Sequence, residues 1–142
     1  MEYKLFNDTY VLRLDRGEEL ISSIKKLCEI ENIGLATIEG LGACDHVVLG
    51  LYDINQQVYH KETFDEAFEI TSIIGNVTMM DDEVYLHIHI NIADEDLHAY
   101  GGHLYECVIS ATCELFIRKI NGQVIRKKDE ETGLNLFNFK ED

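Results

Sequence analysis

The sequence lacks the segments that divide a chain into parts or carry it into a membrane. It contains no proline in 142 residues, and neither a low-complexity stretch nor an obvious linker interrupts it. No apolar run approaches the roughly 20 residues that a membrane-spanning helix needs. The N-terminus, Met1-Glu2-Tyr3-Lys4, has no basic region followed by an apolar stretch, so a secretion signal is not expected. We therefore expect one domain over residues 1–142, with an ordered core from about residue 10 to residue 137.

Paired cysteines are also missing. Cys28, Cys44, Cys107 and Cys113 include no Cys-x-x-Cys pair. Cys28 is expected on the apolar face of a helix and Cys113 on the apolar face of a strand, where a thiol behaves as a small hydrophobic group. These features favour reduced thiols and a cytoplasmic location.

Basic residues are scarce. The chain has 12 Lys and Arg against 27 Asp and Glu, which gives a formal net charge of −15. Proteins that bind nucleic acids gain most of their affinity from Lys and Arg that neutralise phosphates. The short basic run Arg126-Lys127-Lys128 is followed at once by Asp129-Glu130-Glu131. The composition therefore disfavours direct binding to DNA and favours a solvated acidic surface.

Hydrophobic periodicity predicts one helix and about seven strands. Asp15-Arg16-Gly17-Glu18 has the form of a capping box with Asp15 as the N-cap, and the helix after it should end near Asn32 to Gly34. Its expected buried stripe comprises Leu20, Ile21, Ile24, Leu27 and Cys28. Asn55 to Gln57 predicts a turn between two strands, and Asn121-Gly122 predicts a hairpin before residues 123–126. We expect an α+β fold whose mostly antiparallel sheet curls around the helix.

The strongest chemical signal is a group of three histidines. From Val84 to Ile92 apolar and polar residues alternate, which places His87 and His89 on the polar face of one strand. His103 follows the pair Gly101-Gly102, where glycine allows close approach of the backbone. Three imidazoles returning to one place can hold a divalent metal and leave a coordination position open. The spacing therefore predicts a metal site at His87, His89 and His103, with Zn²⁺ or another divalent transition metal.

The chemistry at such an open position is not fixed by the sequence. No nucleophile elbow, phosphate-binding loop or dinucleotide fingerprint is present. Glu39 and Glu114 lie in apolar stretches, where each is either a structural carboxylate or a partner that orients a metal-bound histidine. A bound zinc could activate water for hydrolysis, or it could hold a carboxylate or phosphate ligand. Both alternatives stay open.

Several motifs together resemble the plants-and-prokaryotes conserved domain, known as the PPC or PCC domain, over about residues 11–137. The matching elements are Arg13-x-x-x-Gly17-Glu18-Glu19-Leu20, Ile38-x-Gly40-Leu41-Gly42-Ala43, Leu49-Gly50-Leu51-Tyr52-Asp53, Phe68-Glu69-Ile70-Thr71-Ser72-Ile73-Ile74-Gly75-Asn76, Leu86-His87-Ile88-His89, Gly101-Gly102-His103-Leu104 and Ala111-Thr112-x-Glu114. Their order and spacing are more specific than any single motif.

The resemblance implies a small α+β fold that assembles as a homotrimer. In bacterial and archaeal members similar to this chain, the histidines matching His87, His89 and His103 bind a metal that is usually taken as zinc. Family members are commonly labelled DNA-binding because plant relatives carry an AT-hook beside the domain, and a chain without proline lacks the Arg-Gly-Arg-Pro element of that hook. We therefore expect a metal-binding homotrimer with a site open to a small anionic ligand or substrate, in which Gly101 and Gly102 help to shape the pocket. The alternatives are a DNA-associated regulator and a metal-dependent hydrolase or lyase.

Overall fold

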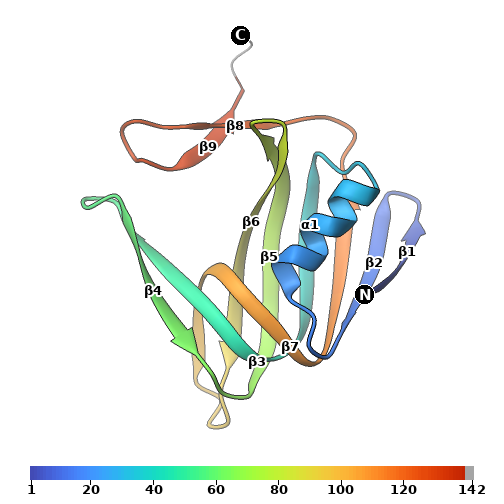
Figure 1. The fold of residues 1–142 in the computed structure, drawn as a ribbon, viewed down its shortest axis with the longest axis vertical. Coiled ribbons are helices and arrows are strands. Elements are labelled where there is room, and N and C mark those ends of the chain that lie inside the picture. The colour runs from blue at the N-terminus through green and yellow to red at the C-terminus, as the bar shows by residue number, and fades with distance from the viewer. Residues whose placement is uncertain (140–142) are drawn as a thin grey trace.

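The computed structural model describes residues 1–139, and within them the chain forms nine strands and one helix (Figure 1). The elements are β1 (Glu2–Phe6), β2 (Thr9–Asp15), α1 (Leu20–Ile30), β3 (Ala36–Asp53), β4 (Val58–Phe64), β5 (Phe68–Met80), β6 (Glu83–Ala93), β7 (Ala99–Lys119), β8 (Ile125–Lys128) and β9 (Asn135–Asn138). The α+β class is confirmed, but the described residues form nine strands instead of the seven expected. None of the described residues lies in a helix that is long and apolar enough to cross a bilayer.

The strand count is higher than expected because a short strand is added at each end of the chain, β1 and β9. β3 and β5 are long strands that continue through glycines, β3 through Gly40 and Gly42 and β5 through Gly75. At Gly42 a β-carbon would lie 2.4 Å from the carbonyl oxygen of Thr112, so only glycine allows β3 and β7 to approach this closely. β1 lies before the core expected from about residue 10.

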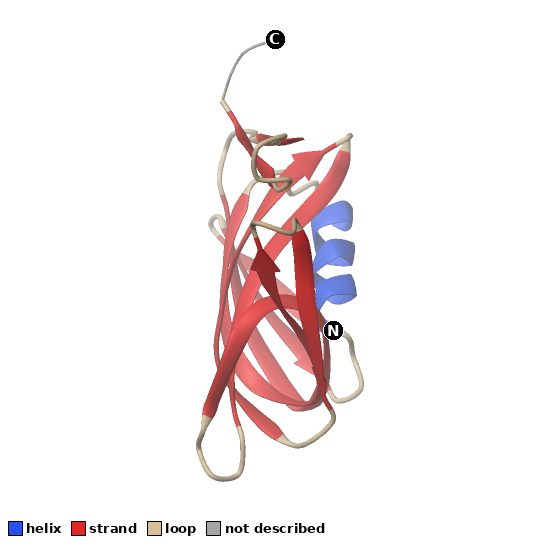
Figure 2. Cartoon of the chain, turned by 90° about the vertical axis from the view of Figure 1, so that its left-hand side faces the viewer, coloured by secondary structure: helices blue, strands red, loops and turns tan. Residues whose placement is uncertain are grey.

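The sheet closes on itself in its central part. The antiparallel pairs β3–β5, β5–β6, β6–β7 and β7–β3 form a cycle. The pairing of β3 with β7 shifts register near Cys44, His46 and Val48, and register shifts of this kind bend a strand and increase its twist where they are β-bulges. The predicted mostly antiparallel sheet is confirmed, with one parallel contact between β5 and β8. α1 lies along one side of the sheet (Figure 2).

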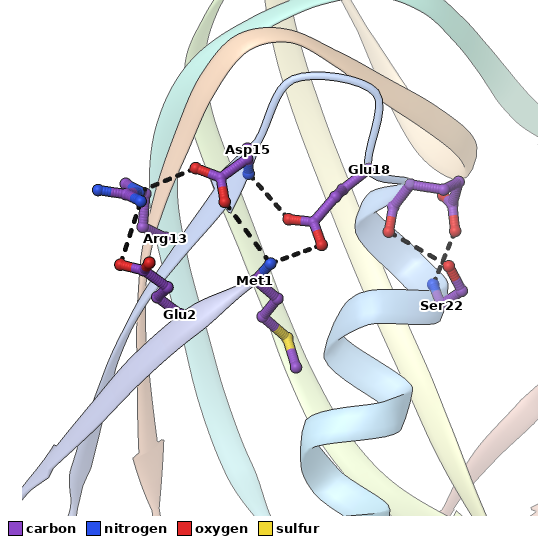
Figure 3. Close-up of polar contacts among 7 residues, drawn as sticks. Met1, Glu2, Arg13, Asp15, Glu18 and Ser22 are labelled. Atoms are coloured by element: carbon purple, nitrogen blue, oxygen red, sulfur yellow. Dashed lines mark hydrogen bonds and ion pairs between the residues drawn. The ribbon is translucent and has the colours of Figure 1, made fainter.

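The helix begins four residues later than the capping box predicted. Glu19, not Asp15, is the N-cap, and its carboxylate accepts hydrogen bonds from the backbone N–H groups of Ile21 (3.0 Å) and Ser22 (2.7 Å). The Glu18 carboxylate accepts from the Asp15 N–H at 2.8 Å and from the amino group of Met1 at 2.6 Å (Figure 3). Asp15 ends β2 instead, because it is paired with Thr112 of β7.

The helix ends as predicted. Asn32 has a positive φ of 51°, and the N–H of Ile33 donates to the carbonyl of Cys28 at 2.8 Å. This is the Schellman arrangement that terminates many helices. The buried face of α1 consists of Leu20, Ile24, Leu27 and Cys28, while Ile21 is only partly buried.

The two predicted turns have different outcomes. β3 and β4 form the hairpin predicted around Asn55 to Gln57. The hairpin predicted at Asn121-Gly122 is wrong, because β8 pairs with β5 and β9 rather than with β7. Both edges of β7 are already occupied at that end, where Arg118 is paired with Thr9 of β2 and with Thr37 of β3. β8 and β9 therefore cross the ends of β5 and β6 as a separate hairpin (Figure 1).

Candidate metal centre

The three predicted histidines lie side by side on the hairpin formed by β6 and β7. His89 and His103 are directly opposite each other in the antiparallel pairing, and His87 is two residues before His89. The alternation along β6 is as predicted: Ile88 and Ile90 are buried, and His87 and His89 lie on the opposite face of the strand. The period of two residues in a strand thus separates the core from the site.

The ligand atoms of the three rings converge. When one ring nitrogen is taken from each imidazole, the three nitrogens lie within 4.8 Å of one another. The Nε2 atoms of His87 and His89 are 3.3 Å apart. The ring centroid of His103 lies 5.2 Å from that of His87 and 5.6 Å from that of His89. Among the described residues this is the one such group of three or more potential metal ligands.

These distances fit a small divalent cation. Two nitrogens bound to one tetrahedral Zn²⁺ at about 2.0–2.1 Å lie about 3.3 Å apart, which is the separation of the His87 and His89 Nε2 atoms. The three ligand nitrogens lie within 4.8 Å of one another, so the third nitrogen would have to move by up to about 1.5 Å to reach the same separation from the other two. In addition, His103 Nδ1 is buried and has no hydrogen-bond partner within residues 1–139. A buried nitrogen without a partner is costly unless something binds it.

Two of the histidines are held in the uncharged form. Burial is the largest of the causes that lower the pKa of His103 to about 4, and the neighbouring His87, His89 and Lys61 contribute to the same shift. Burial, Arg126 and His89 also lower the pKa of His87. Neutral imidazole is the form that coordinates metals. Both rings are therefore uncharged near pH 7.

Two aromatic rings pack against His103. The ring centroids of Tyr59 and Tyr105 lie 5.0 Å and 5.1 Å from that of His103. Gly50 is directly opposite His103 on β3, and a β-carbon there would lie 2.7 Å from the Tyr105 ring. The missing side chain at Gly50 therefore makes room for the rings that orient His103.

The histidines open into a cavity of about 360 Å³. Its walls come from β3, β4, β6, β7, β8, β9 and the residue before β9. They include Gly50, Leu51, Tyr52, Tyr59, Tyr85, Gly102, Arg126, Leu134, Asn135 and Leu136. Tyr85 could have been found from the sequence, because it shares the polar face of β6 with His87 and His89. Arg126 was interpreted only as part of a basic run, and its contacts are with residues about 50 positions away.

The other predicted site residues divide into two groups. Gly102 lines the histidine cavity, and Gly101 lines the adjacent cavity together with Gly102. Glu39 and Glu114 are not brought to the histidines within the chain, since both line a separate depression on the sheet. A residue of β5, Ile74, stands between Glu39 and His89 in the strand register. The histidine cavity has no Asp or Glu among its described lining residues.

The fold and the site together define a small α+β protein that carries a cluster of three histidines on one hairpin. A family model for the Plants and Prokaryotes Conserved (PCC) domain matches residues 1–121. The chain therefore belongs to the PCC domain family. No protein of curated function matches it at a significant level.

Solved structures extend this likeness over nearly the whole chain. A metal-containing protein from Archaeoglobus fulgidus is 35% identical, with 96% of each chain covered and a TM-score of 0.88. A Bacteroides thetaiotaomicron protein that is provisionally described as DNA-binding is 27% identical, with 97% of this chain and 96% of that chain covered and a TM-score of 0.95. The fold alone is also shared with acetolactate decarboxylase from Bacillus subtilis, at 18% identity and a TM-score of 0.53, over 82% of this chain and 54% of that chain.

Proposed function

We propose that this protein binds Zn²⁺ or another divalent transition metal through His87, His89 and His103, and that the site accepts a small anionic ligand or substrate. The observation that carries the proposal is the convergence of three imidazole nitrogens within 4.8 Å at the wall of a cavity. The similarity to a metal-containing archaeal protein supports it. A metal with three protein ligands supplies Lewis acidity toward an oxygen of the ligand.

The test is metal analysis of purified protein and of the double variant His87→Ala, His89→Ala. The parent should carry close to one equivalent of metal after loading with zinc and gel filtration, and the double variant close to none. His60→Ala is a matched control, because His60 is exposed and lies outside the cluster. Equal metal content in the parent and the double variant would refute the assignment.

We also propose that the chain assembles as a homotrimer and acts in the cytoplasm. Leu41, Ile74 and Phe116 are exposed by 54%, 67% and 47%, and they line one depression on the outer face of the sheet. Exposed apolar residues gathered in this way favour burial against another copy. Light scattering should give about three times the chain mass of 16.3 kDa, and Ile74→Glu should lower it. The four cysteines are free and buried, which supports a reducing compartment.

A DNA-associated role is the second candidate, because a 27% identical structure is provisionally described as DNA-binding. The formal net charge of −15 opposes direct contact with phosphates. Duplex binding that weakens steeply with added salt would favour this role. A flat titration at physiological ionic strength would exclude direct binding and leave contact through a partner protein.

A metal-dependent hydrolase or lyase needs a general base beside the metal. Neither Glu39 nor Glu114 reaches the histidine cavity within the chain. Turnover of a substrate panel that is lost on chelation would favour an enzyme over a binding protein.

A further inference from the structure

Arg126 is a buried cation in the wall of the histidine cavity. The residue is only 5% exposed. Its Nε donates to Thr78 Oγ1 at 2.8 Å, its Nη1 to the carbonyl of Asn135 at 2.6 Å and its Nη2 to Asn76 Oδ1 at 2.9 Å. A guanidinium has five N–H groups, so two remain beyond these three bonds. All three acceptors are uncharged.

The Arg126 guanidinium is held beside the histidines. Asn76, which accepts one of its hydrogen bonds, is the register partner of His87 across β5 and β6. Tyr85, two residues before His87 on the same face, lies under the guanidinium at 4.8 Å, and Phe137 lies 4.4 Å from it. The aromatic contacts and the three bonds fix the plane of the guanidinium at the cavity wall.

The local charge is opposite to that of the protein as a whole. The chain has 27 Asp and Glu, yet none lies in the described lining of the cavity, and no carboxylate within residues 1–139 forms an ion pair with Arg126. A buried charge without a counter-ion is costly, and the cost falls when an anion binds. A divalent metal bound to the histidines would add positive charge and favour an anion further. These charges favour an anion in the cavity.

The rest of the wall suits an apolar group. Leu51, Leu134 and Leu136 line the cavity together with the rings of Tyr52 and Tyr59, which pack against each other at 4.8 Å. Apolar walls with one convergent charge are typical of sites for small organic molecules. A volume of about 360 Å³ accommodates a ligand of that kind.

We propose that Arg126 binds the carboxylate of a small organic acid whose apolar part packs against the leucines and tyrosines of this cavity. The inference deepens the proposed metal site, because it names the chemical class of the ligand and the residue that recognises its charge. A guanidinium is suited to a carboxylate because its planar N–H groups can bind both oxygens.

The first experiment uses metal-free protein, so that its result does not depend on the metal assignment. The protein is titrated with benzoate, benzamide, acetate and inorganic phosphate. Calorimetry measures the affinity, and NMR follows the Nε–H resonance of Arg126. Benzoate should bind most tightly and shift the Arg126 resonance, because benzamide lacks the charge and acetate lacks the ring. Arg126→Gln should weaken benzoate binding by about ten- to a hundredfold. Benzamide binding as tightly as benzoate, or phosphate binding more tightly than benzoate, would overturn the proposal.

A second pair of variants keeps the test decisive if Arg126→Gln does not fold. Leu136 is 42% exposed and lines the same cavity, so a polar side chain is tolerated there. Leu136→Glu places a carboxylate in the cavity and should weaken benzoate binding about tenfold or more relative to Leu136→Gln, which has the same size but no charge. Equal benzoate affinity in the two variants would contradict an anion site.

Zinc loading separates this inference from the metal proposal. If zinc binds and benzoate does not, with or without the metal, the metal site stands and the Arg126 site is refuted. If zinc does not bind but benzoate binds in an Arg126-dependent way, the metal assignment fails and the anion site stands.

Discussion

Gly102→Ala should damage the metal site without changing a single ligand. A β-carbon at Gly102 would lie 2.9 Å from the carbonyl oxygen of Gly50 on β3, whereas ordinary contact begins near 3.4 Å. The two strands must therefore separate locally by about 0.5 Å or more, and His103, the next residue on β7, moves with them. Overpacking of this kind costs about 1–3 kcal/mol of unfolding free energy. Displacement of a ligand's support typically reduces metal affinity by about ten- to a hundredfold.

Two measurements check this prediction. Urea unfolding of the metal-free protein gives the loss of stability, and competition with a chelator gives the zinc affinity. Gly34→Ala is the matched control: its β-carbon would contact the Met79 side chain at an ordinary 3.6 Å, so neither quantity should change by more than a small amount. If Gly102→Ala equals the parent in both measurements, the close approach of β3 and β7 does not position His103.

Further predictions concern the helix ends, a surface histidine and metal removal. Glu19→Ala removes the N-cap and should cost about 1 kcal/mol in urea unfolding. Asn32→Ala should cost about 1–2 kcal/mol because Asn32 has a φ of 51°, and Asn32→Gly should cost less. The hydrogen bond that His46 Nδ1 donates to the Asp65 carboxylate raises the pKa of His46, so this contact stabilises the fold fully below about pH 6.5 and its contribution disappears as pH rises through the raised pKa. His46→Gln should therefore be less stable than the parent at pH 5.5 and equal to it at pH 9. Chelation should lower the melting temperature, since zinc at about 100 times its dissociation constant contributes about 2.7 kcal/mol; an unchanged melting temperature would count against a folded-state metal site.

The parts predicted correctly from the sequence depend on local periodicity. Alternation along residues 84–92 assigned His87 and His89 to one face, because side chains of a strand alternate regardless of the rest of the fold. The end of the helix at Asn32 followed from the ability of asparagine to adopt a positive φ.

The parts that were missed depend on contacts between distant residues. Arg126 is paired with Asn76 and Thr78 across 50 and 48 positions, so its neighbours in sequence suggested only a basic run. The Asn121-Gly122 hairpin was wrong because both edges of β7 were already paired with strands from the N-terminal half of the chain. The helix start was misplaced because Asp15 is held in the β2–β7 ladder.

The direct opposition of His89 and His103 has a consequence for folding. A metal ion bound by these residues and His87 would crosslink β6 and β7. A slip of one residue in either strand would turn the opposing imidazole to the far side of the sheet, and the crosslink would be lost. Metal occupancy then reports correct alignment of the two strands, and amide hydrogen exchange in this hairpin should slow on loading more than exchange in β1 and β2.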